Sequence, residues 1–317
     1  MDHHSYAAFL PVEYTTGMVE PTSTWWPWRD MSVHIARAAA PGATVRAMVI
    51  HGGGGYSGAL WPGAAAAVGE GVEVLAPDLP LYGDTVVPDR ASVRYDDWID
   101  LLCDLVRAET AADPRPLVLF GASMGGMLAY EVAARTGTGG QERSDPGNEP
   151  VAAVVATCLL DTSHPAARAA ATRVPWLGRA GPALLRAVGP VLGRVRIPIR
   201  WLADMRHMSS DPRLSALCAA DPRGGGARVP LGFLSSWMNF AHTRPESYAA
   251  APVTLVAPAA DLWTPAELSV RFLQRICAPT TTVMLTNCGH YPIEEPGLTA
   301  LRDAMRVVLT EAAPRAS

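Results

Sequence analysis

Lysine is absent from this sequence, and all 26 residues counted as Lys or Arg are arginines. That absence excludes several enzyme mechanisms. A Walker phosphate loop, a pyridoxal-phosphate Schiff base and a Schiff-base aldolase all need a lysine side chain. A protein kinase needs one to pair with the phosphates of ATP. Any catalytic chemistry in this chain must therefore use other groups.

The chain also has no basic field and no long apolar segment. Its 317 residues carry 30 acidic side chains against those 26 arginines, a net charge of −4, so no nucleic-acid partner is expected. The longest nearly apolar run, Val151–Leu160, is far shorter than the roughly 18 residues of a membrane span. Residues 1–6 show no cationic segment followed by an apolar one, so no signal peptide is expected.

The five cysteines are odd in number and scattered, without the paired spacing of a metal site or a disulfide framework. We therefore expect a reduced, cytoplasmic protein with no metal, no cofactor and no integral membrane segment. The sequence does not set the oligomeric state.

Short runs rich in Val, Leu and Ile alternate with helix-like patterns along most of the chain. Such runs are typical of strands buried on both faces of a parallel sheet, and the alternation predicts an α/β fold with helices flanking a mostly parallel sheet. The expected strands are Arg46–His51, Val72–Ala76, Pro116–Gly121, Val151–Leu160, Val253–Ala257 and Thr281–Leu285, with Val12–Val19 and Ser32–Ala38 as antiparallel strands before them. The expected helices are Ala59–Gly69, Asp96–Ala108, Met124–Arg135, Pro265–Ile276 and Leu298–Ala312.

Two stretches interrupt this alternation. Residues 136–150 are polar and glycine-rich, which predicts a surface loop. Residues 164–247 contain many prolines and helix-like pieces but no convincing buried strand, so they are expected to form an inserted helical subdomain. Residues 1–163 and 248–317 would then form the α/β core. The unusual Trp25-Trp26-Pro27-Trp28 fits three places equally: the sheet edge, the inserted subdomain or a partner surface.

The strongest chemical signal is Gly121-Ala122-Ser123-Met124-Gly125, between a predicted strand and a predicted helix. In this context G-x-S-x-G places the serine on a sharp turn that exposes its hydroxyl, and the small neighbours let strand and helix approach closely. The amide after the serine then points from a helix N-terminus toward a developing oxyanion. The alternative is a glycine-rich turn with an incidental serine. Ser123 is the predicted nucleophile.

A nucleophilic serine needs a base and an acid. His290 is the only histidine after the last expected strand, and it follows the carboxyl end of that strand. The chain order Ser, acid, His then predicts an acid between the two. Asp261, after Val253–Ala257, is favoured because Thr264, Pro265 and Glu267 form a capping box that leaves the aspartate without a capping duty. Asp161 is the rival.

A second amide is needed to complete an oxyanion hole. The run His51-Gly52-Gly53-Gly54-Gly55 follows an expected strand, and glycines let backbone amides turn inward without obstruction. We predict Gly53 and Met124 as the donors, with Gly52 or Gly54 as substitutes, and His51 as a support for the loop. The run matches a dinucleotide-binding fingerprint poorly, because that fingerprint needs G-x-G-x-x-G and an acidic ribose partner.

Taken together, these motifs resemble the α/β-hydrolase superfamily over about residues 31–312. The matching segments are the His51–Gly55 run, Pro77–Asp84, Gly121–Gly125, Asp261–Pro265, and Gly289-His290 with Glu294 and Pro296 downstream. More closely, the chain is similar to capped serine carboxylesterases of the lysophospholipase and monoacylglycerol-lipase-like branch. The resemblance implies a helical cap at residues 164–247 and a structural role for Asp78. The four-glycine loop departs from many capped members, which carry a bulky residue after His-Gly.

The resemblance implies a carboxylic-ester hydrolase that forms an acyl-enzyme on Ser123, with Asp261 and His290 completing the triad. The substrate would be a small or medium acyl ester or a monoacylglycerol-type ester. Thioesterase, lactonase, and biosynthetic cyclase or lyase reactions are alternatives on the same triad, and a non-catalytic ligand-binding protein is a third. Aromatic and methionine residues of the cap either line an acyl pocket or form the cap's own core. The expected substrate-binding residues are Gly52, Gly54, Trp201, Met205 and Trp237.

Overall fold

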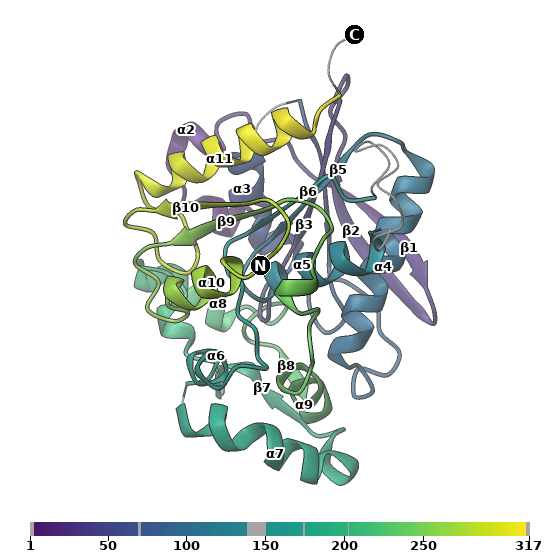
Figure 1. The fold of residues 1–317 in the computed structure, drawn as a ribbon, viewed down its shortest axis with the longest axis vertical. Helices are drawn as coiled ribbons and strands as arrows, with labels where there is room; N and C mark the ends of the chain where they lie inside the picture. The colour runs from purple at the N-terminus through teal and green to yellow at the C-terminus, as the bar shows by residue number, and fades with distance from the viewer. Residues whose placement is uncertain (1–2, 69–70, 138–149, 174, 202, 315–317) are drawn as a thin grey trace.

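A computed structural model of the chain describes residues 3–68, 71–137, 150–173, 175–201 and 203–314 (Figure 1). Apart from its ends, the polar loop expected at residues 136–150 lies outside these described residues. No described helix is both long and apolar enough to cross a membrane.

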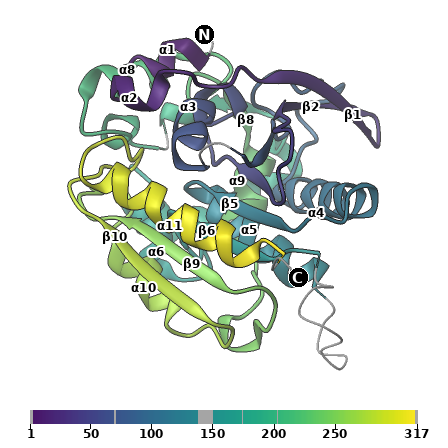
Figure 2. The same cartoon turned by 90° about the horizontal axis from the view of Figure 1, so that it is seen from above.

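The centre of the molecule is an eight-stranded sheet, which confirms the predicted α/β fold (Figure 2). Only β2 runs opposite to the other strands, because it pairs antiparallel with both β1 and β4 while all later pairs are parallel. Every residue of β3, β4, β5 and β6 is buried, as expected for strands covered on both faces. In spatial order the strands are β1 (Thr22–Trp28), β2 (Met31–Ala38), β4 (Glu73–Pro77), β3 (Arg46–Ile50), β5 (Leu117–Gly121), β6 (Ala153–Ala156), β9 (Val253–Pro258) and β10 (Thr280–Leu285).

Helices cover the two faces of the sheet. On one face α3 packs against α11, and on the other α4 packs against α5, while α10 packs on β9. Pro62 lies inside α3, and α4 begins with the Asp97 carboxylate accepting a hydrogen bond from the Arg94 amide. The bounds are α3 (Ser57–Val68), α4 (Tyr95–Ala112), α5 (Met124–Thr136), α10 (Ala266–Leu273) and α11 (Gly297–Ala312).

The N-terminal region differs from the prediction. The strand expected at Val12–Val19 is wrong: the chain forms the short helices α1 (His3–Ala7) and α2 (Val12–Thr15) there. The first strand is instead β1, which contains the tryptophan-rich segment. It lies at the sheet edge, where Pro27 interrupts no inner ladder, and Trp28 is buried with its indole N–H donating to Asp104. This places the segment at the sheet edge rather than on the inserted subdomain.

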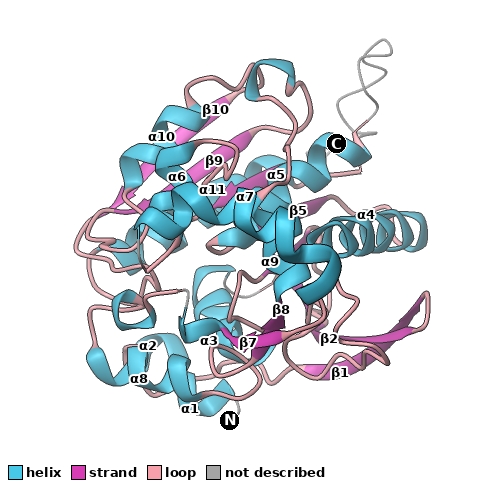
Figure 3. Cartoon of the chain, turned by 90° about the horizontal axis from the view of Figure 1, so that it is seen from below, coloured by secondary structure: helices cyan, strands magenta, loops and turns pink. Residues whose placement is uncertain are grey.

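The chain between β6 and β9 is mainly helical and lies beyond one end of the sheet (Figures 1 and 3). The strand expected at Val151–Leu160 is shorter, because only Ala153–Ala156 pair with neighbours. The segment also contains an unexpected antiparallel pair, β7 (Arg196–Pro198) with β8 (Arg228–Pro230). Its helices are α6 (Pro165–Ala171), α7 (Pro175–Leu192), α8 (Pro212–Ala220) and α9 (Leu231–Met238), with 3₁₀ turns at Ile199–Trp201, Met205–His207 and Pro245–Ser247.

Candidate active site

Ser123 lies on a sharp turn between β5 and α5, at the carboxyl end of the central strand. Its backbone has a positive φ of 56°, with ψ of −126°. A non-glycine residue rarely adopts a positive φ, and such strain persists only where the surroundings hold the residue in place. The Thr157 hydroxyl, just after β6, accepts a hydrogen bond of 2.9 Å from the Ser123 amide and helps to hold the turn. Thr157 had no signal in the sequence.

The glycines around Ser123 are required by close approaches between backbones. A Cβ atom on Gly121 would lie 2.2 Å from the Gly125 carbonyl oxygen, and one on Gly126 would lie 2.1 Å from the Cys158 oxygen. A Cβ on Gly125 would lie 2.1 Å from the Ile50 oxygen. These separations are far below van der Waals contact, so the motif allows α5 to pack directly on the sheet behind the serine.

The three residues predicted as nucleophile, base and acid are brought together. Ser123 Oγ lies 2.8 Å from Nε2 of His290, and His290 Nδ1 lies 2.8 Å from Oδ2 of Asp261. Asp261 follows β9 and His290 follows β10, so both come from loops at the carboxyl ends of strands, as Ser123 does. Asp261 and His290 are buried. Because the carboxylate can only accept, Nδ1 carries the ring proton, and Nε2 is left to accept the proton of the Ser123 hydroxyl.

Asp261 is held ionised by several donors. Burial by itself raises the pKa of this carboxyl, but the charge and hydrogen bond of His290 and the donors of Thr264 hold the pKa below its ordinary value. Oδ1 accepts from the amides of Trp263 and Thr264 at 2.8 and 2.9 Å, and Oδ2 accepts from the Thr264 hydroxyl at 2.6 Å. The Trp263 ring lies 4.7 Å from the His290 ring.

The capping box predicted at Thr264, Pro265 and Glu267 does not form. Helix α10 begins after Pro265, and no side chain caps its N-terminus. Thr264 instead turns its hydroxyl to Asp261 and lies 3.2 Å from His290 Nδ1. The rival Asp161 lies 3.8 Å from His242 and accepts from Ser163, with no contact to His290 among the described residues.

The glycine-rich loop after β3 lies against the start of α5. A side chain on Gly52 would come within 2.9 Å of the Met124 amide nitrogen, so this position must lack a Cβ for the amide to stay open. Among the described residues, neither the Gly53 nor the Met124 amide has a hydrogen-bond partner. Two unpaired amides beside the serine hydroxyl are what an oxyanion would require.

His51 fixes the shape of this loop. Its Nε2 accepts a hydrogen bond of 2.9 Å from the Leu79 amide, so Nδ1 is protonated and donates to the Gly52 carbonyl at 2.8 Å. Burial lowers the pKa of His51, which keeps the ring neutral in this arrangement.

Two cavities meet at Ser123 and Gly53. The front cavity, of about 150 Å³, lies under α7 and α9, and the rear cavity, of about 80 Å³, extends toward α3 and α11. Of the predicted substrate-binding residues, Trp237 lines the front cavity, and Gly52 and Gly54 line the rear one.

Trp201 and Met205 line neither cavity. The Trp201 side chain is 60 % exposed, and Ile199 from the same 3₁₀ turn lines the front cavity in its place. Met205 is buried and packs behind the glycine-rich loop, where its Cε lies 3.8 Å from the Cβ position of Gly54. Both side chains are large and apolar, but nothing in the sequence shows which way a 3₁₀ turn faces.

A group of side chains that could bind a metal lies near the loop after β4, but the Asp78 carboxylate at its centre already accepts hydrogen bonds within the protein. His34, Asp78 and Asp84 place one ligand atom each within 4.8 Å of one another. Asp78 accepts hydrogen bonds from His34 Nδ1 and from the amides of Ser57 and Asp84. Burial raises the pKa of Asp78, and these donors lower it further than burial raises it, so the carboxylate ties β2, α3 and this loop together.

Comparison with known proteins gives a family and a fold. The alpha/beta hydrolase family matches residues 47–302. A soluble variant of monoglyceride lipase from Saccharomyces cerevisiae is similar in structure, with a TM-score of 0.70 at 15% identity over 93% of this chain and 97% of that one. A monoacylglycerol lipase from Paleococcus ferrophilus gives a TM-score of 0.66 at 20% identity, over 88% and 98% of the chains. An esterase from Thermogutta terrifontis gives 0.57 at 16%, over 93% and 100%. No curated protein sequence matches the chain significantly.

Proposed function

Because this chain belongs to the alpha/beta hydrolase family, we propose that it is a serine hydrolase that cleaves carboxylic esters through an acyl-enzyme on Ser123. The observation that carries the proposal is the unbroken chain of 2.8 Å contacts from Ser123 through His290 to Asp261. The strained backbone at Ser123 supports it, because such strain concentrates at functional sites.

The first step forms a tetrahedral intermediate on Ser123. His290 Nε2 accepts the proton of the Ser123 hydroxyl as Oγ attacks the ester carbonyl carbon. Asp261 holds the imidazole in the tautomer that leaves Nε2 free and stabilises the ring when it becomes charged. The amides of Gly53 and Met124 donate to the oxyanion, and one such donor contributes roughly 10² to 10³ in rate.

Collapse of this intermediate completes the acyl-enzyme, and hydrolysis then returns the free enzyme. His290 gives its proton to the leaving oxygen as the carbon–oxygen bond breaks. Water then attacks the acyl carbon with His290 as the general base, and the acid product leaves as Ser123 recovers its proton. Backbone amides supply the electrophilic stabilisation, so the cycle uses no lysine.

Residues 164–247 would serve as a cap over this site. α7 and α9 contribute Leu184, Leu185, Leu234 and Trp237 to the front cavity, and no charged side chain is on its described lining. Such a wall suits the hydrocarbon part of an acyl group. The front cavity is therefore proposed as the acyl site.

The test is hydrolysis of p-nitrophenyl esters together with labelling by a fluorophosphonate probe, which reacts with an activated serine. We expect turnover and labelling of the wild-type chain. In Ser123→Ala we expect no labelling and a fall in kcat on the order of 10⁶. A Ser163→Ala variant, whose hydroxyl bonds Asp161 away from the triad, is the matched control. Wild-type rates in Ser123→Ala would overturn the nucleophile assignment.

A further inference from the structure

The rear cavity has no assigned role. It shares Ser123 and Gly53 with the front cavity, so a group bound in it would lie on the other side of the reacting carbon. Its wall comes from elements far apart in the chain: α1, the glycine-rich loop, α3, α8 and α11. At about 80 Å³ against about 150 Å³, it is the smaller of the two.

The wall of the rear cavity is mostly apolar. Its aliphatic and sulfur-containing part includes Ala59, Leu60, Ala64, Met208 and Cys218, and no Asp, Glu or Arg is on the described lining. Burial raises the pKa of the Cys218 thiol to about 12, so this group is neutral.

The polar side chains on the same wall already form hydrogen bonds within the protein. The Tyr6 hydroxyl donates to Asp221 at 2.8 Å, and the Tyr291 hydroxyl donates to the Ala59 carbonyl at 2.5 Å. Thr157 accepts from the Ser123 amide, and both nitrogens of His290 are used in the triad. A ligand with several hydroxyls would therefore replace few of its hydrogen bonds to water, which is costly.

The position of His290 decides which half of an ester enters this cavity. The imidazole must give its proton to the leaving oxygen, and His290 lines the rear cavity but not the front one. Met124, the second proposed oxyanion donor, lines only the front cavity. The leaving group therefore faces the rear cavity while the acyl group extends under α7 and α9.

We propose that the rear cavity is a leaving-group site for a small apolar alcohol. The inference rests on the proposed function and narrows its substrate class. The natural ester carries hydrocarbon on both sides of the scissile bond, with the shorter part on the alcohol side. A polyhydroxylated alcohol such as glycerol, which the names of the two structurally similar lipases imply for those proteins, does not match this wall.

The first experiment compares esters of one acid, octanoic acid, with different alcohols. Release of acid is followed at constant pH for the methyl, propyl, butyl and 1-glyceryl esters. We expect kcat/KM to rise by up to about fourfold for each methylene buried on the alcohol side. The glyceryl ester, similar in size to the butyl ester, should fall below it. A glyceryl ester hydrolysed faster than the butyl ester would overturn the proposal.

The second experiment uses two helical glycines that have room for a side chain. A Cβ on Gly63 of α3 would lie 3.8 Å from the Tyr291 hydroxyl, and Gly63 lines the rear cavity. A Cβ on Gly181 of α7 would lie 3.7 Å from Met238 Cε, and Gly181 lines the front cavity. Gly63→Leu and Gly181→Leu therefore fill one cavity each by the same change.

We expect Gly63→Leu to lower the butyl-to-methyl ratio of kcat/KM by more than about tenfold, the loss of roughly two buried methylenes. Gly181→Leu should instead lower the ratio of octanoyl to acetyl esters. Val307→Ala, at an exposed position of α11, is the control for both ratios. If Gly63→Leu changed the acyl-length ratio and not the alcohol ratio, the assignment of the two cavities would be reversed and the proposal wrong.

Failure of this inference is distinguishable from failure of the proposed function. Fluorophosphonate labelling of Ser123 with a preference for glyceryl esters would leave the serine hydrolase intact and remove only the leaving-group site. Absence of labelling and of turnover with every ester would remove the proposed function itself.

Discussion

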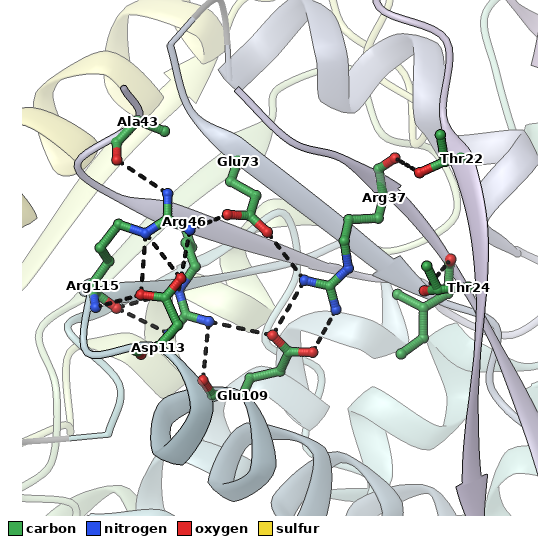
Figure 4. Close-up of polar contacts among 10 residues, drawn as sticks. Thr22, Thr24, Arg37, Ala43, Arg46, Glu73, Glu109, Asp113 and Arg115 are labelled. Atoms are coloured by element: carbon green, nitrogen blue, oxygen red, sulfur yellow. Dashed lines mark hydrogen bonds and ion pairs between the residues drawn. The ribbon is translucent and has the colours of Figure 1, made fainter. Parts of the chain in front are cut away.

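Two buried polar networks lie at opposite ends of the central sheet, and they differ in whether their groups face a cavity. At the carboxyl ends of the strands, Ser123, His290 and Asp261 form a linear chain that faces two cavities. At the amino ends, three arginines and three carboxylates surround the starts of β3 and β4 (Figure 4). This amino-end network consists of Arg37, Arg46, Glu73, Glu109, Asp113 and Arg115.

The charged groups of the amino-end network bond to one another and to nearby backbone carbonyls. Arg46 is 1 % exposed and donates to Glu109 and to the carbonyls of Asp113 and Arg115, while Arg37 bridges Glu73 and Glu109. The six side chains carry three charges of each sign, and Glu73 and Asp113 each pair with Arg115.

The difference shows how a buried polar cluster can be read for function. Both networks pair their charged groups, so pairing does not distinguish them. Only the carboxyl end combines a strained residue, unpaired amides and empty space beside a nucleophile. Substitutions should therefore separate the two ends, with activity lost at one and stability at the other.

The largest expected effect is on activity at the carboxyl end. Asp261→Asn should lower kcat by about 10⁴, because an amide in place of the carboxylate favours the wrong tautomer of His290. The measurement is kcat with a p-nitrophenyl ester, with circular dichroism to show that the fold is kept. The matched control is Asp161→Asn, since this rival acid pairs with His242 instead. A larger loss in Asp161→Asn than in Asp261→Asn would reverse the assignment of the acid.

The next effect is on stability at the amino end. Arg46→Met should lower the free energy of unfolding by about 3–5 kcal/mol. The substitution removes a buried positive charge and leaves the carboxylates that face it, Glu109 and Asp113, without that partner. Urea denaturation measures it. Arg194→Met is the control, because the ion pair of Arg194 with Asp89 is exposed and is worth less than about 1 kcal/mol. Equal losses in the two variants would show that burial does not set the value of the network.

A smaller effect tests the support of the triad. Thr264→Val keeps the shape of the side chain but removes the hydroxyl that donates to Asp261. We expect kcat to fall by about tenfold with KM little changed, because the lost hydrogen bond positions the acid, while valine keeps the bulk of Thr264 where this residue lines the front cavity. Thr264→Ser, which restores the hydroxyl, should recover most of the rate. If the serine variant were as slow as the valine variant, packing of the methyl group would be the cause.

Much of the carboxyl end could be predicted because its signals are local. The strand, turn and helix around Ser123 occupy one continuous segment, and apolar runs that end shortly before Asp261 and His290 mark two further strand ends. The amino-end network had no such signal, since Arg37 and Glu109 are 72 residues apart and only the sheet brings them together.

The errors in the prediction have the same origin. No strand was predicted at Thr22–Trp28, where Pro27 is tolerated because an edge strand has a free side. The pair β7–β8 is three residues long on each strand, too short for any periodic pattern. Whether Ile199 or Trp201 faces the cavity depends on how the helical segment packs over the sheet, which composition does not determine.

The smallest expected effect is the pH dependence of the amino-end network. The hydrogen bond from Arg115 is the main cause that lowers the pKa of Asp113 from 3.8 to about 2. A carboxyl with a lowered pKa stabilises the fold above the unfolded value, and that stabilisation is lost as the pH falls from about 4 through about 2.

Asp113→Asn removes this titration, so its stability should fall less steeply than that of the wild type between pH 4 and pH 2.5. Asp113 is partly exposed, so the difference at neutral pH should stay below about 1 kcal/mol. Urea midpoints at half-unit pH intervals provide the measurement. Parallel curves for the two proteins would mean that the Arg115 contact does not hold Asp113 ionised, and that the amino-end network depends on its buried members alone.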